Sequence, residues 1–369
     1  MAIKVLVISD YRNYITARPE AEIFIGLAKM GFQIYIMTYK EAELVKEFEA
    51  VGIKVIDFHP KKKFDKSEIQ RIRETLIEKE IDIVHLFNNP AIVKGIRASK
   101  GLKVKVVLYR GYAGNIHWYD PFSYLKFLHP RVDKIFCNSM GVEEFIQKQL
   151  LFNKNKTITI NKGHNLNWYA DYPPYGIKKE LGLAPDTFLL INVANNRRMK
   201  GIPYLLKAIN NLPKELPIHL LLVGRDMDTK ENLRIIEKGG SKKRVHIIGF
   251  RKNVLNIVSA CDVFVLSSIK GESITKSVIE AMSLGLAPII SDIPGNKELV
   301  INEESGLITR AKKPKELSNA ILRLYENKSL REGLGRNAKK RIDSYLNINQ
   351  TILKTKQLYE ELVANKNRR

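Results

Sequence analysis

Residues 260–295 read ACDVFVLSSIKGESITKSVIEAMSLGLAPIISDIPG, and the succession of elements in this stretch indicates the fold. The apolar run Val263–Leu266 predicts a buried strand. The segment Thr275–Leu284 has the pattern of a helix, and Gly285 follows it as a stop. A second apolar run, Pro288–Ser291, predicts the next strand. A strand, a helix and a strand in this order form the crossover unit of a parallel sheet.

Short apolar runs alternate with amphipathic segments along the rest of the chain. In the first half, strands are expected at residues 4–9, 33–37, 53–56, 83–86, 104–109 and 134–137. In the second half, further strands are expected at residues 188–193, 219–223 and 245–248. The alternation predicts an α/β protein with two Rossmann-like, doubly wound domains, each built on a parallel sheet.

The length of the chain suits two domains of moderate size, because 369 residues exceed what one ordinary core organises. Turn-forming residues crowd the segment 161–186. We therefore place the first domain at residues 1–175 and the second at residues 176–345. Residues 346–369 have a helical pattern and are expected to pack back on the first domain.

The composition is strongly basic, with a formal net charge of +23. Such a surface favours anionic lipid headgroups, phosphorylated substrates or other polyanions, although a solvated lysine-rich surface gives the same count. No apolar run has the length of a membrane span, and the N-terminus lacks a signal-peptide layout. We therefore expect a cytoplasmic protein that sits, at most, peripherally on the inner face of the membrane. Cys137 and Cys261 lie beside apolar runs and are expected to be reduced core residues.

One loop of the second half is suited to a phosphorylated nucleotide. The sequence NNRRMKG at residues 195–201 follows an expected strand and precedes a helix. It brings Arg197, Arg198 and Lys200 to the start of that helix. Cations there add to the exposed N–H groups and the dipole of the helix, which together favour a diphosphate. Solvated loop charges are the alternative reading of the same residues.

Glycines follow two further strands of the second half. Gly224 and Gly249 would let the backbone approach a ligand closely, although a plain turn also explains each of them. Neither half has a G-x-G-x-x-G motif after its first strand, and the sequence has no P-loop lysine motif. A dehydrogenase or a nucleoside triphosphatase is therefore disfavoured.

Two carboxylates, Glu272 and Glu280, stand eight positions apart at the helix of the stretch quoted first. Together with the segments VANNRRMKGIPYLLKAI, LLLVGRD and VHIIGF, this Glu-x7-Glu motif resembles that of the retaining glycosyltransferases of the GT-B fold (glycosyl transferases group 1, family 4-like). The resemblance covers almost the whole chain. It implies two domains that face each other across a cleft, with the acceptor on the first and a nucleotide-diphosphate sugar on the second. It also implies no divalent metal and no cofactor besides the donor.

The resemblance assigns roles to residues of the second domain. Glu280 would bind the ribose hydroxyls, and Glu272 would contact hydroxyls of the donor sugar. Lys200, with Arg197 or Arg198, would neutralise the departing diphosphate. The remaining donor contacts are expected from Ser273, Ile274, Thr275, Gly224, Gly249 and Phe250.

The first domain departs from the family pattern at two places. The family histidine after the fifth strand is replaced by Arg110, which would act on a carboxylate or phosphate of donor or acceptor, and His117 follows seven residues later. The family's Gly-Gly loop is replaced within Asp10–Arg18, which is expected to be a loop before a helix with Pro19 in its first turn. Acceptor contacts are expected from Arg12, Tyr14, Arg18, Asn88, His117 and Trp118.

These features predict an enzyme that moves a sugar from a nucleotide-diphosphate sugar, with UDP as the expected nucleotide, to a glycan or lipid-linked acceptor. The expected setting is cell-envelope polysaccharide or lipopolysaccharide synthesis, with the anomeric configuration retained. A nucleotide-sugar epimerase of the same fold is the nearest alternative, because it uses the donor alone. A non-catalytic protein that binds polyanions or a membrane would also explain the charge. Nucleic acid is not an expected partner, because basic and aromatic residues do not interleave along a strand.

Overall fold

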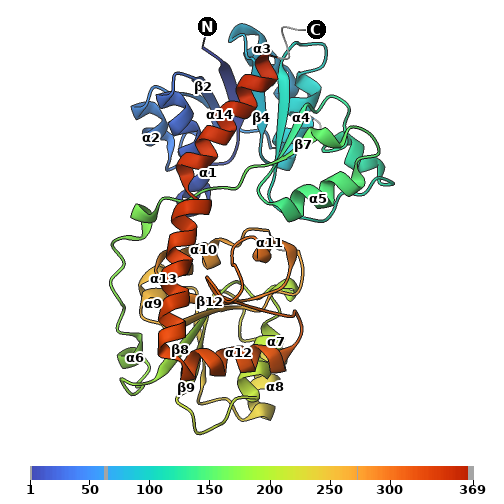
Figure 1. Ribbon diagram of the computed structural model, residues 1–369. Coiled ribbons are helices and arrows are strands. Elements are labelled where there is room, and N and C mark those ends of the chain that lie inside the picture. The colour runs from blue at the N-terminus through green and yellow to red at the C-terminus, as the bar shows by residue number, and fades with distance from the viewer. Residues whose placement is uncertain (1, 62–64, 272, 365–369) are drawn as a thin grey trace. The chain divides into compact units, whose positions relative to one another are not determined.

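A computed structural model describes residues 2–61, 65–271 and 273–364 (Figure 1). The chain forms two compact units, Met1–His164 with Leu346–Arg369 and Asn165–Tyr345. The first boundary lies earlier in the chain than the one expected at residues 175/176. The second coincides with the one expected at residues 345/346.

The first unit is built on a parallel sheet that has seven strands in the part of the chain described. The order β3-β2-β1-β4-β5-β6-β7 reverses direction between β1 and β4, which makes this pair the switch point of the sheet. The strands are β1 (Lys4–Ile8), β2 (Gln33–Thr38), β3 (Lys54–Asp57), β4 (Ile83–Leu86), β5 (Lys105–Arg110), β6 (Lys134–Cys137) and β7 (Thr157–Thr159). The short strand β7 was not expected from the sequence.

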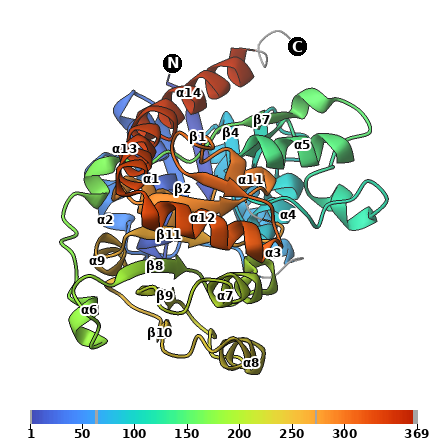
Figure 2. The same cartoon turned by 60° about the horizontal axis from the view of Figure 1, so that its bottom comes forward.

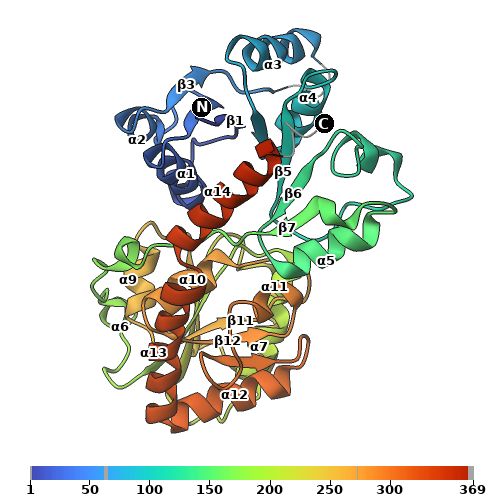
Figure 3. The same ribbon diagram turned by 45° about the horizontal axis from the view of Figure 1, so that its top comes forward.

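Helices cover both faces of this sheet (Figure 3). Alternate residues of β1 point to opposite faces, so that Val5 and Val7 pack with α1, α2 and α14, whereas Leu6 and Ile8 pack with α3, α4 and α5. Both sets are fully buried, which explains why the strand reads as a continuous apolar run. The helices are α1 (Tyr14–Lys29), α2 (Val45–Ala50), α3 (Lys66–Glu78), α4 (Asn89–Ala98), α5 (Met140–Gln149) and α14 (Ile348–Ala364).

The start of α1 corrects the loop expected at Asp10–Arg18. The helix begins at Tyr14, and Pro19 lies inside it rather than in its first turn. The cause is Asn13, whose side chain accepts a hydrogen bond from the Thr16 N–H at 3.1 Å and caps the helix. Tyr14 and Arg18 are therefore helical residues.

The C-terminal helix α14 completes the first unit, as expected for residues 346–369. The Thr351 hydroxyl donates to the Asn161 carbonyl at 2.7 Å and accepts from the Gly163 N–H at 2.9 Å. On the sheet side, the Tyr359 hydroxyl lies 2.7 Å from Nδ1 of His85, a buried residue of β4. These polar contacts fix the register of the amphipathic helix α14 against the sheet.

The second unit contains a parallel sheet with six strands among the described residues, in the order β10-β9-β8-β11-β12-β13. Its switch point lies between β8 and β11. The unit expected from residues 260–295 is present as β11, α10 and β12, with the two strands paired in parallel. The strands are β8 (Phe188–Val193), β9 (Ile218–Val223), β10 (Val245–Gly249), β11 (Val263–Leu266), β12 (Ala287–Ser291) and β13 (Leu307–Thr309).

Two groups of helices flank this second sheet. The helix α7 packs against both α8 and α12 (Figure 2), and α10 packs against α9 and α13. The helices are α6 (Ile177–Glu180), α7 (Ile202–Asn210), α8 (Lys230–Gly239), α9 (Val254–Ser259), α10 (Lys276–Ser283), α11 (Pro294–Lys297), α12 (Pro314–Glu326) and α13 (Lys328–Tyr345). In the part of the chain that is described, none of the helices has the length and apolarity to cross a membrane.

Both cysteines are free thiols, as expected. Cys137 is buried at the end of β6, and burial raises the pKa of its thiol to about 12. Cys261 is half-buried at the end of α9. The two residues therefore belong to the packing of the units.

The buried His85 makes the stability of the first unit depend on pH. Burial lowers the pKa of this imidazole to about 3, against about 6.5 in an unfolded chain. The folded state thus resists a proton that the unfolded state accepts, so stability is complete above the unfolded pKa and falls as the pH drops. From pH 7.5 to pH 5 the free energy of unfolding should lose about 2 kcal/mol through this group.

Urea titrations at the two pH values test this prediction in wild type and His85→Phe. The variant should show a pH effect smaller by about that amount. Tyr359→Phe is the matched control, because it removes the hydroxyl but keeps the buried imidazole and its pH dependence. An equal loss of stability in wild type and His85→Phe would contradict the assignment.

Candidate functional site

The loop after β8 is bonded to the segment after β11, at the switch point of the second unit. The buried Ser267 hydroxyl donates to the carbonyl oxygens of Lys200 at 3.1 Å and Gly201 at 3.2 Å. The Ile269 N–H donates to the Met199 carbonyl at 2.7 Å. Because these bonds hold main-chain atoms, they fix the backbone of Lys200 at the carboxyl edge between β8 and β11. We call residues 194–201, held in this way, the clamped loop.

Gly201 is the residue that lets the clamped loop approach β11. Its φ of +64° lies in the left-handed region. A Cβ atom at this position would lie 2.2 Å from the Ser267 carbonyl oxygen and 2.9 Å from Cγ2 of Ile269. A side chain here would therefore push the loop off the segment that holds it.

The loops after β9 and β10 join the same layer. The Asn196 N–H donates to the Arg225 carbonyl at 2.9 Å, and the Gly224 N–H donates to the Gly249 carbonyl at 2.9 Å. A Cβ atom on Gly224 would lie 1.8 Å from the Ala194 carbonyl oxygen, so this position also requires glycine. The strand-end glycines predicted from the sequence are thus brought together. The backbone of Gly224 packs directly against the clamped loop at Ala194.

The next side chains at this edge are open to a ligand. Phe250 is 61% exposed, and the Arg225 guanidinium lies 5.3 Å from the centroid of its ring. Nothing lies within 4 Å of the position that a Cβ atom on Gly249 would take, among the described residues. Arg197 and Arg198 are exposed, and Lys200 is half-buried. The edge therefore combines a flat aromatic ring, open backbone and several cations.

Helix α10 carries Glu280 in its second turn. The carboxylate is buried, and Lys276, one turn earlier, forms an ion pair with its Oε1 atom. At the start of the helix, the Thr275 hydroxyl donates to Oδ1 of Asn296 at 3.3 Å instead of capping the helix. Ser273 and Thr275 are buried there and Ile274 is half-buried. The first turn of α10 therefore has no side-chain cap from Thr275.

Glu272, the first carboxylate of the predicted motif, lies outside the described residues. Its predicted contact with the donor sugar stays a prediction.

The structure gives Arg110 a place inside its own loop. This residue is buried, its Nε donates to the Tyr112 carbonyl at 2.8 Å, and an Nη atom donates to the Gly114 carbonyl. Its guanidinium also lies 3.6 Å from the centroid of the Tyr112 ring and 4.9 Å from that of Phe127. These contacts direct the guanidinium to residues 112–127, so that it orders this loop.

The predicted acceptor residues of the first unit fall in different elements. Asn88 caps α4 through its Oδ1 atom, which accepts from the Ala91 N–H at 3.1 Å. The guanidinium carbon of Arg18 lies 5.5 Å from the centroid of the Tyr14 ring, and both residues are on α1. His117 is half-buried and stacks on Tyr119, whereas Trp118 is 51% exposed.

A stack around Arg12 was missed by the sequence analysis. The Arg12 guanidinium is paired with Asp10 and lies 4.0 Å from the centroid of Tyr39, which in turn stacks on His59 at 4.9 Å. Nε2 of His59 lies 2.7 Å from Nδ2 of Asn88. Burial lowers the pKa of His59, so the ring is neutral near pH 7. The sequence could have indicated this contact, because Tyr39 and His59 follow two neighbouring parallel strands, whose carboxyl ends lie at the same edge of the sheet.

A second buried pair was also missed. Nζ of Lys162 lies 2.8 Å from Oε2 of Glu20 and 4.1 Å from the ring centroid of Tyr109. Burial acts to lower the pKa of Lys162, but Glu20 and Tyr109 together outweigh this effect and raise the pKa above its usual value. The residues are far apart in the sequence, so no local pattern reported the pair.

In the described ranges, His, Cys, Asp and Glu side chains do not gather in groups of three or more that could hold a metal ion. The groups described at the second unit are cations, a helix start and the buried carboxylate of Glu280, a set that suits a phosphorylated and hydroxylated ligand.

Two Rossmann-like units, the second with a cationic loop clamped at its switch point, make up the GT-B fold. Family models specify the group. Residues 176–341 match the model described as Glycosyl transferases group 1, and residues 21–168 match the model described as Glycosyltransferase Family 4. The chain therefore belongs to the GT-B glycosyltransferases, as its resemblance predicted.

Individual relatives agree with this placement. The UDP-Gal:alpha-D-GlcNAc-diphosphoundecaprenol alpha-1,3-galactosyltransferase of Escherichia coli is 30% identical over 242 residues, which are 63% of this chain and 61% of that protein. The chain matches between 43% and 61% of the length of its first curated relatives.

Solved structures show the same fold over the whole chain. A glycosyltransferase from Rickettsia africae has a TM-score of 0.83 at 18% identity, covering 99% of both chains. Anabaena HepE in complex with UDP has a TM-score of 0.76 at 20% identity, covering 98% of this chain and 100% of that one.

Replacing Gly201 by alanine tests the clamped loop. The added Cβ would collide with the Ser267 carbonyl and displace the loop, so the affinity for UDP should fall at least about tenfold, or about 1.4 kcal/mol. Isothermal titration calorimetry measures this change. Gly182→Ala is the matched control, because Gly182 has the same φ of +64° but nothing within 4 Å among the described residues. Equal affinities in the two variants would show that the clamp does not shape the site.

Proposed function

We propose that this protein transfers a sugar from a nucleotide-diphosphate sugar, with UDP as the nucleotide, to a glycan or lipid-linked acceptor. The observation that carries the proposal is the clamped loop, which holds Arg197, Arg198 and Lys200 at the switch point of the second unit. Support comes from a relative named as a galactosyltransferase that uses UDP-Gal and a diphosphoundecaprenol-linked acceptor. A structural neighbour holds UDP.

The chemistry follows from where charge develops during transfer. As the bond to the sugar breaks, the anomeric carbon becomes positive and the departing diphosphate becomes negative. Cations whose backbone is already fixed stabilise that leaving group without reorganising during the reaction. The N–H groups at the start of α10 add to this stabilisation. The clamped loop therefore lowers the barrier by stabilising the diphosphate that leaves as the bond breaks.

Glu280 orients the nucleotide in this proposal. Lys276 contacts its Oε1 atom, and we assign Oε2 to the ribose hydroxyls. A carboxylate oxygen of Glu280 can accept hydrogen bonds from two neighbouring hydroxyls. Glu272 is assigned to the donor sugar, and Gly249 with Phe250 to the base.

The acceptor is assigned to the first unit, at the carboxyl edge near β1 and β4 where Arg12 and Asn88 lie. The reaction is proposed to retain the anomeric configuration and to need neither a divalent metal nor a resident cofactor. Cell-envelope glycan synthesis is the proposed setting, because relatives are named for lipid-linked glycan acceptors. The proposed location is the cytoplasm, peripheral to the membrane.

Two substitutions test the assignment. Glu280→Gln and Lys200→Ala should each lower the turnover of a UDP-sugar by about 100-fold or more, because each removes a charged contact with the donor. Lys230→Ala, at an exposed position of α8, is the control and should keep wild-type turnover. A thermal-shift screen of UDP, GDP and other nucleotides comes first, since a ligand that binds the folded state raises its melting temperature.

Two results would contradict the proposed function. NMR of the donor incubated alone would show a new epimer if the protein were an epimerase. Absence of any nucleotide-dependent shift in melting temperature, together with steeply salt-dependent binding to polyanions, would indicate a non-catalytic protein.

A further inference from the structure

An exposed aromatic and aliphatic surface lies on the first unit, and it includes Trp118, which the sequence had suggested as an acceptor contact. Its most exposed side chains are Phe152 at 83%, Phe122 at 68%, Tyr119 at 66%, Leu151 at 58% and Trp118 at 51%. Large apolar side chains rarely gather on a protein surface unless a partner covers them. We call residues 117–128 with residues 148–156 the aromatic–lysine surface.

The two segments of this surface meet around a hollow of about 550 Å³. The hollow is lined on one side by Tyr124 and Leu128 and on the other by Leu150, Leu151 and Phe152. A hydrogen bond from the Trp118 N–H to Oε1 of Gln149, at 3.2 Å, joins the segments at the end of α5. The exposed side chains of Leu151 and Phe152 therefore line an apolar hollow together with residues of the other segment.

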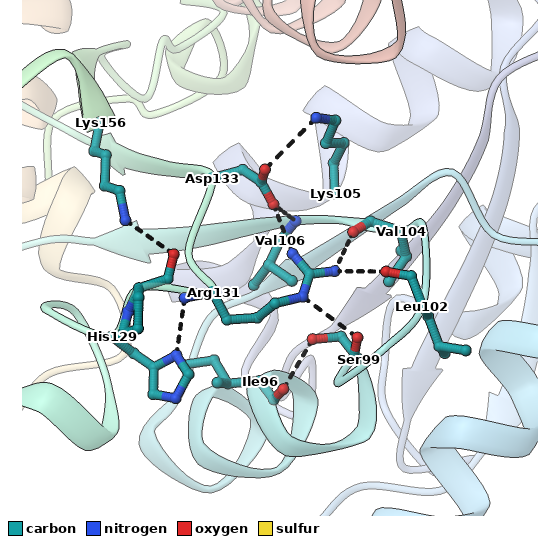
Figure 4. A network of polar contacts seen from close by, with 11 residues as sticks. Ile96, Ser99, Leu102, Val104, Lys105, Val106, His129, Arg131, Asp133 and Lys156 are labelled. Atoms are coloured by element: carbon teal, nitrogen blue, oxygen red, sulfur yellow. Dashed lines mark hydrogen bonds and ion pairs between the residues drawn. The ribbon is translucent and has the colours of Figure 1, made fainter. Parts of the chain in front are cut away.

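A polar network holds the segment between Leu128 and β6, which contributes Pro130 to the lining of the hollow (Figure 4). The Arg131 guanidinium donates to the carbonyl oxygens of Ser99 and Leu102, both at 3.3 Å, and it is paired with Asp133 at 2.9 Å. Nζ of Lys156 donates to the Pro130 carbonyl at 3.1 Å. The loop between Leu128 and β6 is thus tied to the segment before β5, and the surface rests on a fixed base.

The hollow lies at the amino-terminal edge of the sheet. Its lining residues come immediately before β6, which begins at Lys134, and before β7, which begins at Thr157. Ligands of open α/β sheets bind at the opposite, carboxyl edge. The hollow of the aromatic–lysine surface is therefore separate from the carboxyl edge where Arg12 and Asn88 lie.

Positive charge borders the apolar side chains. Residues 145–156 read FIQKQLLFNKNK, with three lysines and no acidic residue. Lys148 and Lys154 are exposed, and Lys126 is half-buried beside the exposed Leu125. The acid of the other segment, Asp120, is occupied by the N–H of Phe122 and the hydroxyl of Ser123. Four lysines against this one aspartate give the surface a net positive charge.

We propose that the aromatic–lysine surface docks the protein on an anionic phospholipid bilayer. Leu151 and Phe152 would enter the boundary between headgroups and acyl chains. Trp118 and Tyr119 would lie at headgroup level, where amphipathic rings concentrate. Lys148 and Lys154 would pair with lipid phosphates. The aromatic–lysine surface is complementary to a bilayer, because its apolar centre matches the acyl chains and its cationic border matches the anionic headgroups above them.

Co-sedimentation with vesicles tests the proposal without any sugar transfer. Wild type should bind vesicles of phosphatidylcholine with phosphatidylglycerol, bind phosphatidylcholine alone weakly, and lose binding as salt is raised. Leu151→Ser with Phe152→Ser should weaken binding at least about tenfold, because these side chains supply the apolar contact. Lys148→Ala and Lys154→Ala should each weaken it about fivefold.

Leu233→Ser is the matched control, because Leu233 is 43% exposed on α8 of the other unit, and it should bind like wild type. The tryptophans supply a second readout, since the chain has two of them. In a Trp168→Phe variant, the emission of Trp118 should shift to shorter wavelength with anionic vesicles and be quenched by brominated lipid.

Three results would overturn the proposal. They are no binding to anionic vesicles, binding that survives the Leu151→Ser and Phe152→Ser substitutions, and a dimer of wild type that these substitutions dissociate, which would mean that a second copy covers the surface. The calorimetric affinity for UDP separates this proposal from the transferase assignment. It should be unchanged in the double variant, and each proposal can fail without the other.

Discussion

The contact on which the candidate site depends is the bond between the clamped loop and the end of β11. The hydroxyl of Ser267 makes this contact by donating to the carbonyl oxygens of two consecutive residues, Lys200 and Gly201. Because position 201 is a glycine, the two segments can approach this closely. The cations before that glycine are held by their backbone rather than by their flexible side chains. A site that must stabilise a developing diphosphate benefits from this arrangement, because the charges need not be gathered when the bond breaks.

The two units use the same sheet plan for different tasks. In the second unit, the loops after β8, β9 and β10 are bonded to one another and form one layer. In the first unit, the corresponding edge carries the stack of Arg12, Tyr39 and His59, while the opposite edge carries the aromatic–lysine surface. If that surface rests on a bilayer, an acceptor attached to a lipid would lie near the unit that is proposed to bind it.

Sequence patterns predicted those parts of the structure that depend on local order. The βαβ unit around Glu280 and the fully buried strands follow from apolar runs whose length and flanking glycines are characteristic. The start of α1 was missed because one capping side chain, that of Asn13, outweighs the signal of a downstream proline. The contacts of Arg110 with its own loop, and of His59 with Asn88, join residues through tertiary structure, so no spacing in the sequence reports them. Strands as short as β7 and β13 carry too few residues to show a period.

Hydrogen–deuterium exchange with and without UDP tests the central claim most directly, because it reports which backbone amides a nucleotide protects. With UDP bound, exchange should be slower in peptides that cover residues 194–201, 249–251 and the start of α10. Exchange in residues 117–128 and 148–156 should not change. Protection confined to the first unit, or unchanged exchange at the clamped loop under saturating UDP, would contradict this claim.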